Sequence, residues 1–191
     1  SLTSTKLGRE STIVEKVGYD KEGHTVYSKL GNGMETTYSY DKVRDRLERM
    51  ELQGKGGKVM SNAYSYDAVD NILGMENSIS PQSNKGMNPS KLGGTFSHSY
   101  RYDKLDRLVN ASGKAKNARY VMDMAYNMMS MPQHKYQEVD SSLTAHSYRN
   151  DYLYEDTSHP TAPTQIGHEH YTYDANGNPT LVEDDSLGTT R

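Results

Sequence analysis

The chain has 191 residues and a formal net charge of -3, and this length fits one domain or part of a larger one. It has no cysteine, which excludes disulfides, thiolate metal sites and thiol nucleophiles. It has neither a long basic run nor a long apolar run, so we expect no nucleic-acid binding and no membrane span.

Tyrosine takes the place of the usual aliphatic core residues. Leu, Ile, Val and Phe together make up about 15% of the chain, below the ~20% expected of a globular core. The chain instead has Tyr 16 and Met 10, with Phe 1 and Trp 0. Tyrosine favours strands and buries its ring while its hydroxyl stays hydrogen-bonded or wet. The composition therefore predicts thin, tyrosine-rich sheets.

A degenerate repeat runs through most of the chain. Five Tyr-x-Tyr pairs occur, and Asp directly follows four of them, whereas Glu155 follows the fourth pair along the chain. Two further copies have Val17 or Met124 in place of the first tyrosine, which gives seven copies at irregular spacing. The structural repeat motif comprises Tyr19, Asp20, Tyr38, Tyr40, Asp41, Tyr64, Tyr66, Asp67, Tyr100, Tyr102, Asp103, Tyr126, Tyr152, Tyr154, Tyr171, Tyr173, Asp174 and Gly177.

The repeat sets the expected organisation of the chain. Residues 1–12 form an N-terminal lead-in, residues 13–185 form about seven degenerate hairpins, and residues 186–191 form a tail. Within the repeat region, residues 77–94 are rich in Ser, Asn, Pro and Gly, so we expect a mobile surface loop there. Seven hairpins correspond to about 14 strands.

Each copy is expected to form a β-hairpin. A period of two places both tyrosines of a pair on one face of a strand. The following Asp accepts backbone N–H groups and begins a turn, and a Gly three residues later supplies the positive φ that closes the turn. In chain order, the residues at this closing position are Gly23, Arg44 (or Asp45 after a one-residue slip), Asp70, Asp106 and Gly177.

Return strands and exit turns are expected to follow each turn. The segment at residues 41–52 also has helical periodicity, but the other copies continue into strand-like sequence, so we expect a strand there. Return strands are expected to begin at Arg46, Asn71 and Arg107, and exit turns are expected at residues 31–33, at Gly54 and at Gly113.

The repeat resembles the YD repeats of the Rhs family. Residues 171–178 (YTYDANGN) are similar to the family consensus Tyr-x-Tyr-Asp-x-x-Gly-Arg-Leu, and residues 100–108 (YRYDKLDRL) match it with Asp106 in place of Gly. Residues 159–167 (HPTAPTQIG) resemble a motif common near the end of the repeat region in bacterial Rhs proteins. The resemblance covers roughly residues 13–185.

The resemblance implies an all-β fold, in which antiparallel β-hairpins form a curved, spiralling sheet that is a slice of an Rhs-type β-shell. Toxin-complex C subunits and teneurins have related shells. It also implies a non-enzymatic wall around a C-terminal effector or toxin domain, with the core domain and effector of the same chain as partners. A secreted or cell-envelope location is implied too, although no signal peptide precedes Ser1. No Asp-Pro occurs, so the self-cleavage known in the family is not carried over.

No catalytic, metal or cofactor site is expected. His168 and His170 share one face of an expected strand and could ligate a metal with His159, but no metal-site spacing surrounds them. The repeated aspartates are explained by their turn positions, so paired catalytic carboxylates are not expected.

A second hypothesis is a carbohydrate-binding or adhesive surface module. It requires a continuous row of tyrosine rings in solvent, whereas packing between neighbouring hairpins would bury the rings. The open edges of a cut sheet could also pair with a second copy of the chain.

Overall fold

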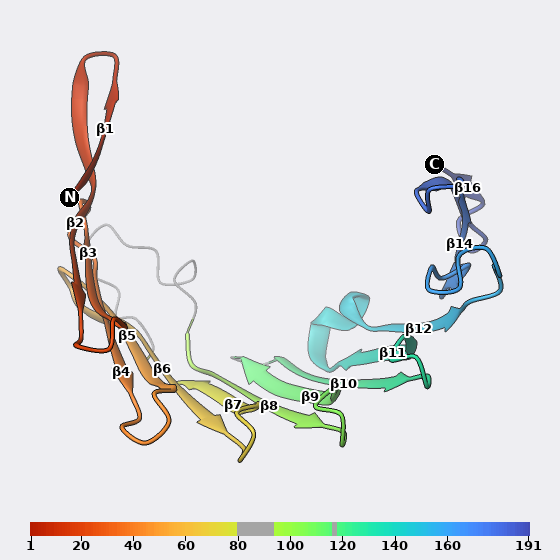
Figure 1. Cartoon of the computed structure of the whole chain (residues 1–191), viewed down its shortest axis with the longest axis horizontal. Helices are drawn as coiled ribbons and strands as arrows, with labels where there is room; N and C mark the ends of the chain where they lie inside the picture. The colour runs from red at the N-terminus through yellow and green to blue at the C-terminus, as the bar shows by residue number, and fades with distance from the viewer. Residues whose placement is uncertain (80–93, 116–117) are drawn as a thin grey trace. The chain divides into compact units, whose positions relative to one another are not determined.

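The structure, a computed structural model, describes residues 1–79, 94–115 and 118–191. Within these described residues, sixteen β-strands follow one another in the sheet in the same order as in the chain (Figure 1). Where the register is described, neighbouring strands pair antiparallel. The expected all-β array of antiparallel hairpins is therefore confirmed, with two strands more than the count of about 14.

The chain divides into two compact units, and the first comprises residues 1–99 and 113–117. Its strands are β1 (Leu2–Lys6), β2 (Arg9–Tyr19), β3 (Thr25–Leu30), β4 (Glu35–Tyr40), β5 (Leu47–Gly54), β6 (Gly57–Tyr66), β7 (Ile72–Asn77) and most of β8 (Phe96–Tyr102). Residues 1–12, expected as a lead-in, hold β1 and the start of β2, which pair through a turn at Leu7 and Gly8.

The second unit comprises residues 100–112 and 118–191. Its strands are the first part of β9 (Leu108–Ala115), β10 (Ala118–Tyr126), β11 (Pro132–Val139), β12 (Tyr148–Leu153), β13 (Gln165–Ile166), β14 (Glu169–Tyr173), β15 (Pro179–Asp184) and β16 (Thr189–Thr190). A short 3-10 helix, η2 (Ser141–His146), lies between β11 and β12. Among the described residues, no helix has the length and apolar character needed to span a membrane.

The connections between strands alternate between two kinds. Every second connection is a turn that follows a repeat tyrosine, such as the turn between β4 and β5 or between β10 and β11. The connections at the other end of the strands differ in length, from two residues between β5 and β6 to residues 78–95 between β7 and β8. The irregular spacing of the repeat therefore arises largely at one end of the hairpins.

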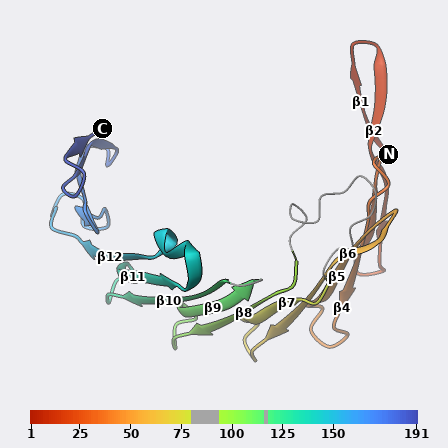
Figure 2. The ribbon, with the colours of Figure 1, turned by 180° about the vertical axis from the view of Figure 1, so that it is seen from behind.

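The two faces of the sheet in the first unit differ in chemistry. Successive residues of a strand point to opposite faces, so each cross-strand row belongs to one face. Figure 2 shows β4 to β7 side by side. One row across these strands contains Tyr38, Met50, Asn62 and Asn77. The neighbouring row, on the opposite face, contains Thr37, Glu51 and Ser61.

The buried core is thin, as the composition predicts. Among the described residues, Val59, Ala111 and Met131 are the buried hydrophobic side chains, at 7%, 3% and 8% exposure, and no side chain is below 2%. Stability must therefore depend largely on contacts between neighbouring hairpins, as in other repeat arrays.

A β-bulge recurs just before the second tyrosine of a hairpin. Ser39 pairs with Arg49 whereas Tyr40 pairs with Leu47, so Glu48 is left without a partner residue in β4. The same register shift occurs in the β2–β3, β6–β7, β10–β11 and β14–β15 hairpins. A bulge of this kind bends the strand and re-aims the side chains beside it. The hairpin pattern in the sequence does not reveal it.

Other local expectations have mixed outcomes. The strand expected within residues 41–52 is confirmed, because β5 begins at Leu47. The exit turn expected at Gly113 is wrong, because this residue lies inside β9. Most of the loop expected at residues 77–94 lies outside the described residues. Its first residue, Asn77, is 3% exposed, and its side-chain amide donates to the carbonyls of Ile79 (3.0 Å) and Gly94 (2.7 Å).

Candidate functional site

One side chain holds each repeat turn. Asp67 Oδ1 accepts the backbone N–H groups of Val69 and Asn71, both at 2.9 Å, and Oδ2 accepts the Asn71 side-chain amide at 3.0 Å. Asp174 makes the corresponding bonds in its own turn, at 2.9, 2.9 and 3.0 Å. Asn127 holds its turn through its amide oxygen alone, with two backbone bonds at 2.9 and 3.0 Å. Each such side chain satisfies backbone donors that the turn would otherwise expose.

A residue in the left-handed region closes the turns, and it is often not glycine. The one-residue slip expected at Asp45 is observed, so the turn after Tyr40 is one residue longer than the others. Asp and short polar residues tolerate this region better than bulky or β-branched ones. The closing residues and their φ angles are Gly23 (91°), Asp45 (55°), Asp70 (72°), Asp106 (58°), Ser130 (64°) and Gly177 (80°).

The copy that ends at Tyr154 departs from the expected pattern. Glu155 directly follows the tyrosine, but Asp156 takes the turn role. Its Oδ1 accepts the backbone N–H of Ser158 at 2.8 Å, and its Oδ2 lies 2.8 Å from Nδ1 of His159. The extra residue therefore shifts the turn by one position without removing its carboxylate.

The second tyrosine of a pair connects one hairpin to the preceding one. In five copies its hydroxyl donates to a backbone carbonyl at or just before the start of the preceding hairpin's return strand. The bonds are Tyr40 to Thr25 (3.0 Å), Tyr66 to Leu47 (2.8 Å), Tyr126 to Leu108 (2.9 Å), Tyr154 to Pro132 (3.0 Å) and Tyr173 to Pro163 (2.7 Å). Each hydroxyl is therefore committed to a neighbouring hairpin.

A cation completes this junction where the return strand is preceded by arginine. Arg107 Nε donates to Asp103 Oδ2 of its own turn at 2.7 Å, and the guanidinium lies 4.7 Å from the ring centroid of Tyr126 in the next hairpin. Its Nη1 also donates to Ser130 Oγ of the next turn at 3.1 Å. We call this set a hairpin clasp: the turn Asp, the side chain that bonds it, and the second tyrosine of the following hairpin.

The same hairpin clasp recurs in the first unit. Arg46 Nε donates to Asp41 Oδ2 at 2.7 Å, the guanidinium lies 5.0 Å from the Tyr66 ring, and Nη1 donates to the carbonyl of Asp67 at 3.1 Å. Sequence reasoning noted Arg46 only as the polar first residue of an expected return strand and missed its role between hairpins. The signal was present, because a side chain able to bond Asp precedes the return strand in nearly every copy.

Histidine occupies the clasp position in two copies. His24 Nδ1 lies 2.9 Å from Asp20 Oδ2, and its ring stacks on Tyr40 with centroids 4.8 Å apart. His159 bonds its own turn carboxylate, and its ring lies 6.0 Å from that of Tyr173. A planar aromatic or guanidinium group thus contacts the tyrosine ring in four junctions, although the His159 ring is tilted by 43° to that of Tyr173.

These contacts fix the ionisation of the groups that form the clasps. The hydrogen bond from Arg46 lowers the pKa of Asp41 to about 2, and the bond from Arg107 lowers the pKa of Asp103. Burial raises the pKa of four of the tyrosines whose hydroxyls bond the preceding hairpin, namely Tyr40, Tyr66, Tyr154 and Tyr173. At neutral pH the carboxylates are therefore ionised acceptors and the phenols are neutral donors, which is the form that the clasps need.

The ten tyrosines of the five pairs are all half-buried. Tyr171 donates its hydroxyl to Glu169 at 2.5 Å, and burial together with this carboxylate raises its pKa to about 12. By contrast Tyr19, which stands outside the pairs, is 64% exposed. The freely exposed row of paired tyrosines that carbohydrate binding requires is not seen in the described residues.

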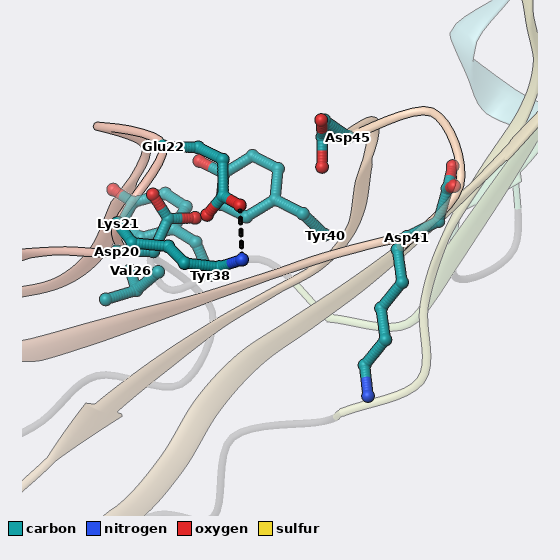
Figure 3. A pocket seen from close by; sticks show the side chains of 9 residues that line it. Asp20, Lys21, Glu22, Val26, Tyr38, Tyr40, Asp41 and Asp45 are labelled. Carbon is teal, nitrogen blue, oxygen red and sulfur yellow. Dashed lines mark ion pairs between the residues drawn. The ribbon is translucent and has the colours of Figure 1, made fainter.

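A cleft of about 440 Å³ lies between the first two repeat turns in the first unit (Figure 3). Tyr38 and Tyr40 line it, beside an ion pair between Lys21 and Glu22 at 3.0 Å. Two of its carboxylates belong to repeat turns and are already bonded within them. These two carboxylates are therefore committed to their own turns rather than directed at a ligand in the cleft.

The histidines considered as metal ligands are only partly brought together. His168 Nδ1 and His170 Nε2 bond the two oxygens of Asp185, at 2.7 and 3.1 Å. His159 belongs instead to a hairpin clasp. In the part of the chain that the structure describes, no group of three or more metal-binding side chains is suitably placed.

Comparisons with known proteins identify relatives among toxin components. No family model matches the chain. In sequence it is similar to two toxin subunits of Yersinia entomophaga, YenC2 and YenC1, each 32% identical over 123 and 120 residues respectively. These matches cover 60% of this chain but 12% of each relative, so the chain spans about an eighth of the curated relatives it matches.

Solved structures show the same fold. The Photorhabdus luminescens Tc holotoxin pore matches with a TM-score of 0.64 and 16% identity, over 92% of this chain and 10% of that chain. The crystal structure of TcdB2-TccC3-Cdc42 matches with a TM-score of 0.69 and 16% identity, over 98% and 11%.

Proposed function

We propose that this Rhs-type YD-repeat chain, whose sequence relatives are toxin subunits, forms part of a protein shell. The shell encloses a C-terminal effector or toxin domain of the same polypeptide, and the whole protein is secreted. The role of this segment is mechanical and not enzymatic. Its partners are the remaining wall, the core domain and the effector of its own chain.

The hairpin clasps are the observation that carries the proposal. They use the aspartates, the tyrosine hydroxyls and the guanidinium groups that would otherwise serve binding or catalysis. Asp103, for example, is bonded by two backbone N–H groups and by Arg107. A surface whose recurring polar groups are committed to neighbouring hairpins suits a wall better than a ligand site.

The relatives support the proposal that this segment is part of a toxin shell. Both curated relatives are described as toxin subunits, and the structural matches are components of toxin assemblies. A wall that encloses a toxin would protect the producing cell and the toxin from each other until delivery. One layer of hairpins is sufficient for such a wall, because a shell needs a continuous barrier rather than a thick core.

Protease protection in the full-length protein tests enclosure. We expect the segment that follows the shell to resist digestion in the wild type and to be cleaved rapidly after Tyr66→Ala, which removes a clasp ring and hydroxyl. Tyr64→Phe is the matched control, because the Tyr64 hydroxyl only accepts a long bond (3.5 Å) from Asn62. Rapid digestion of the downstream segment in the folded wild type, at the rate seen in Tyr66→Ala, would refute enclosure.

A further inference from the structure

The residue that bonds the turn carboxylate or amide varies along the chain in its ability to carry charge. Arginine is permanently charged, asparagine and methionine are neutral, and histidine changes its charge near neutral pH. In chain order the residues at this position are His24, Arg46, Asn71, Arg107, Met131, His159 and Asn178.

His159 reproduces two contacts of the arginine clasps and lies close to the next turn. Its Nδ1 lies 2.8 Å from Asp156 Oδ2 of its own turn, and its ring lies 6.0 Å from that of Tyr173 in the next hairpin. Its ring also lies against the next turn, because its Cδ2 is 3.6 Å from the position that a Cβ would take at Gly177, much as Arg107 reaches the turn at Ser130. The imidazole therefore lies between two successive turns, and its side chain is 19% exposed.

The groups that face His159 are acceptors on both sides. Asp156 lies on its own turn, and Asp174 and the backbone of Ala175 lie on the next turn. A neutral imidazole donates from one nitrogen only, whereas an imidazolium donates from both. Only the protonated form can therefore donate to both turns at once.

We propose that His159 is a pH-operated lock between the last two repeat hairpins. When it is protonated, it ties the turn at Asp156 to the turn that follows Tyr173, as Arg107 ties its own pair of turns. When it is neutral, it keeps one bond and the junction loosens. The Arg46 and Arg107 junctions do not respond to pH in this range.

The electrostatics give the direction and the pH window of the lock. The bond to Asp156 raises the pKa of His159 above its usual 6.5, and that bond lowers the pKa of Asp156 below 3.8. A raised histidine pKa gives stability that is complete below the unfolded pKa and is lost as pH rises through the folded value. The lock is thus closed in mild acid, at pH values between the lowered pKa of Asp156 and the raised pKa of His159, and it is open in mild alkali.

Hydrogen exchange in the full chain tests the lock, read at amides beside the junction. The Tyr171 N–H donates to the Thr164 carbonyl at 2.9 Å, and the Thr164 N–H donates to the Leu153 carbonyl at 2.8 Å. After correction for intrinsic exchange rates, we expect their protection to be about two- to fivefold higher at pH about 5.5 than at pH about 8. Other copies of the repeat have arginine or asparagine at this position, which supplies two matched substitutions. His159→Arg should give high protection at both pH values, and His159→Asn should give low protection at both.

Two results would overturn the proposal. The first is a pH dependence that persists in His159→Asn. The second is an NMR titration of the wild-type His159 ring with a midpoint at or below that of an unstructured histidine. Asp185→Asn controls for the nearby His168 and His170 pair, and it should leave the pH dependence unchanged. Loss of the dependence in Asp185→Asn would place the sensor at Asp185 and refute the assignment to His159.

Discussion

The hydroxyl of Tyr66 gives a sharp test of the bond between hairpins. Tyr66→Phe removes one hydroxyl group, whose donated bond to the Leu47 carbonyl is 2.8 Å long. The ring remains, and so does its contact with the Arg46 guanidinium at 5.0 Å. The substitution therefore isolates the hydrogen bond from the rest of the clasp.

The expected loss of stability follows from this geometry. One well-formed hydrogen bond at a half-buried site contributes about 1 kcal/mol net. That is about a fivefold change in the local unfolding equilibrium. Tyr66→Leu removes the cation–π contact as well, which should cost about 0.5–1 kcal/mol more. Tyr64→Phe in the same strand should cost close to nothing, because its only assigned bond is 3.5 Å long.

Urea denaturation together with hydrogen exchange measures these differences. Repeat arrays can unfold in parts, so the Asp67 N–H, which donates to the Asn71 carbonyl at 3.0 Å, gives the local value. The order expected is Tyr66→Leu worst, then Tyr66→Phe, then Tyr64→Phe. Equal losses for Tyr66→Phe and Tyr64→Phe would show that the hydroxyl bond between hairpins contributes nothing.

Three further substitutions test other parts of the fold. Asp45→Val should destabilise by about 1–2 kcal/mol in urea denaturation, because a β-branched residue resists its φ of 55°, while Asp45→Gly should be neutral or stabilising; equal effects would contradict this. Gly31→Ala should lower the free energy of unfolding by more than about 2 kcal/mol, because the new Cβ would lie 1.7 Å from the Thr12 carbonyl oxygen. Gly18→Ala is the control, because its Cβ makes only an ordinary contact at 3.4 Å. Equal stability of Gly31→Ala and the wild type would contradict the β2–β3 geometry. Burial raises the pKa of Tyr173, so the bond that its hydroxyl donates stabilises the fold fully below the unfolded pKa of about 10 and is lost as pH rises through the folded pKa. Tyr173→Phe should remove this loss of stability at alkaline pH. An unchanged dependence of stability on pH would count against it.

The hairpins were predictable because their signals are local. Alternating tyrosines, an acidic residue after the strand and a small or acidic residue at the closing position each act within a few residues of chain. The slip to Asp45 was visible for the same reason, since Asp adopts positive φ more readily than the arginine before it. The shifted turn at Asp156 follows the same chemistry, although the repeat pattern, which puts the turn residue directly after Tyr154, pointed to Glu155 instead.

The contacts between hairpins could not be deduced in the same way. The hydroxyl of Tyr126 reaches Leu108, 18 residues earlier, and the sequence spacing between copies is irregular. The recurring bulge adds one residue to the return strand in five hairpins, so partners counted from an ideal ladder are displaced there. Arg46 and Arg107 looked like ordinary polar residues at strand starts because their targets lie in another hairpin.

The two kinds of connection described above suggest where this chain tolerates engineering. Every clasp is at the end of the hairpins where the aspartate turns lie, so lengthening a link at the opposite end leaves all of those joins untouched. An epitope or a small folded passenger grafted between β5 and β6, at Lys55 and Gly56, should leave the flanking register intact. For the same reason, we expect homologous chains to differ mostly in the lengths of the links at that end, where insertions do not disturb the clasps.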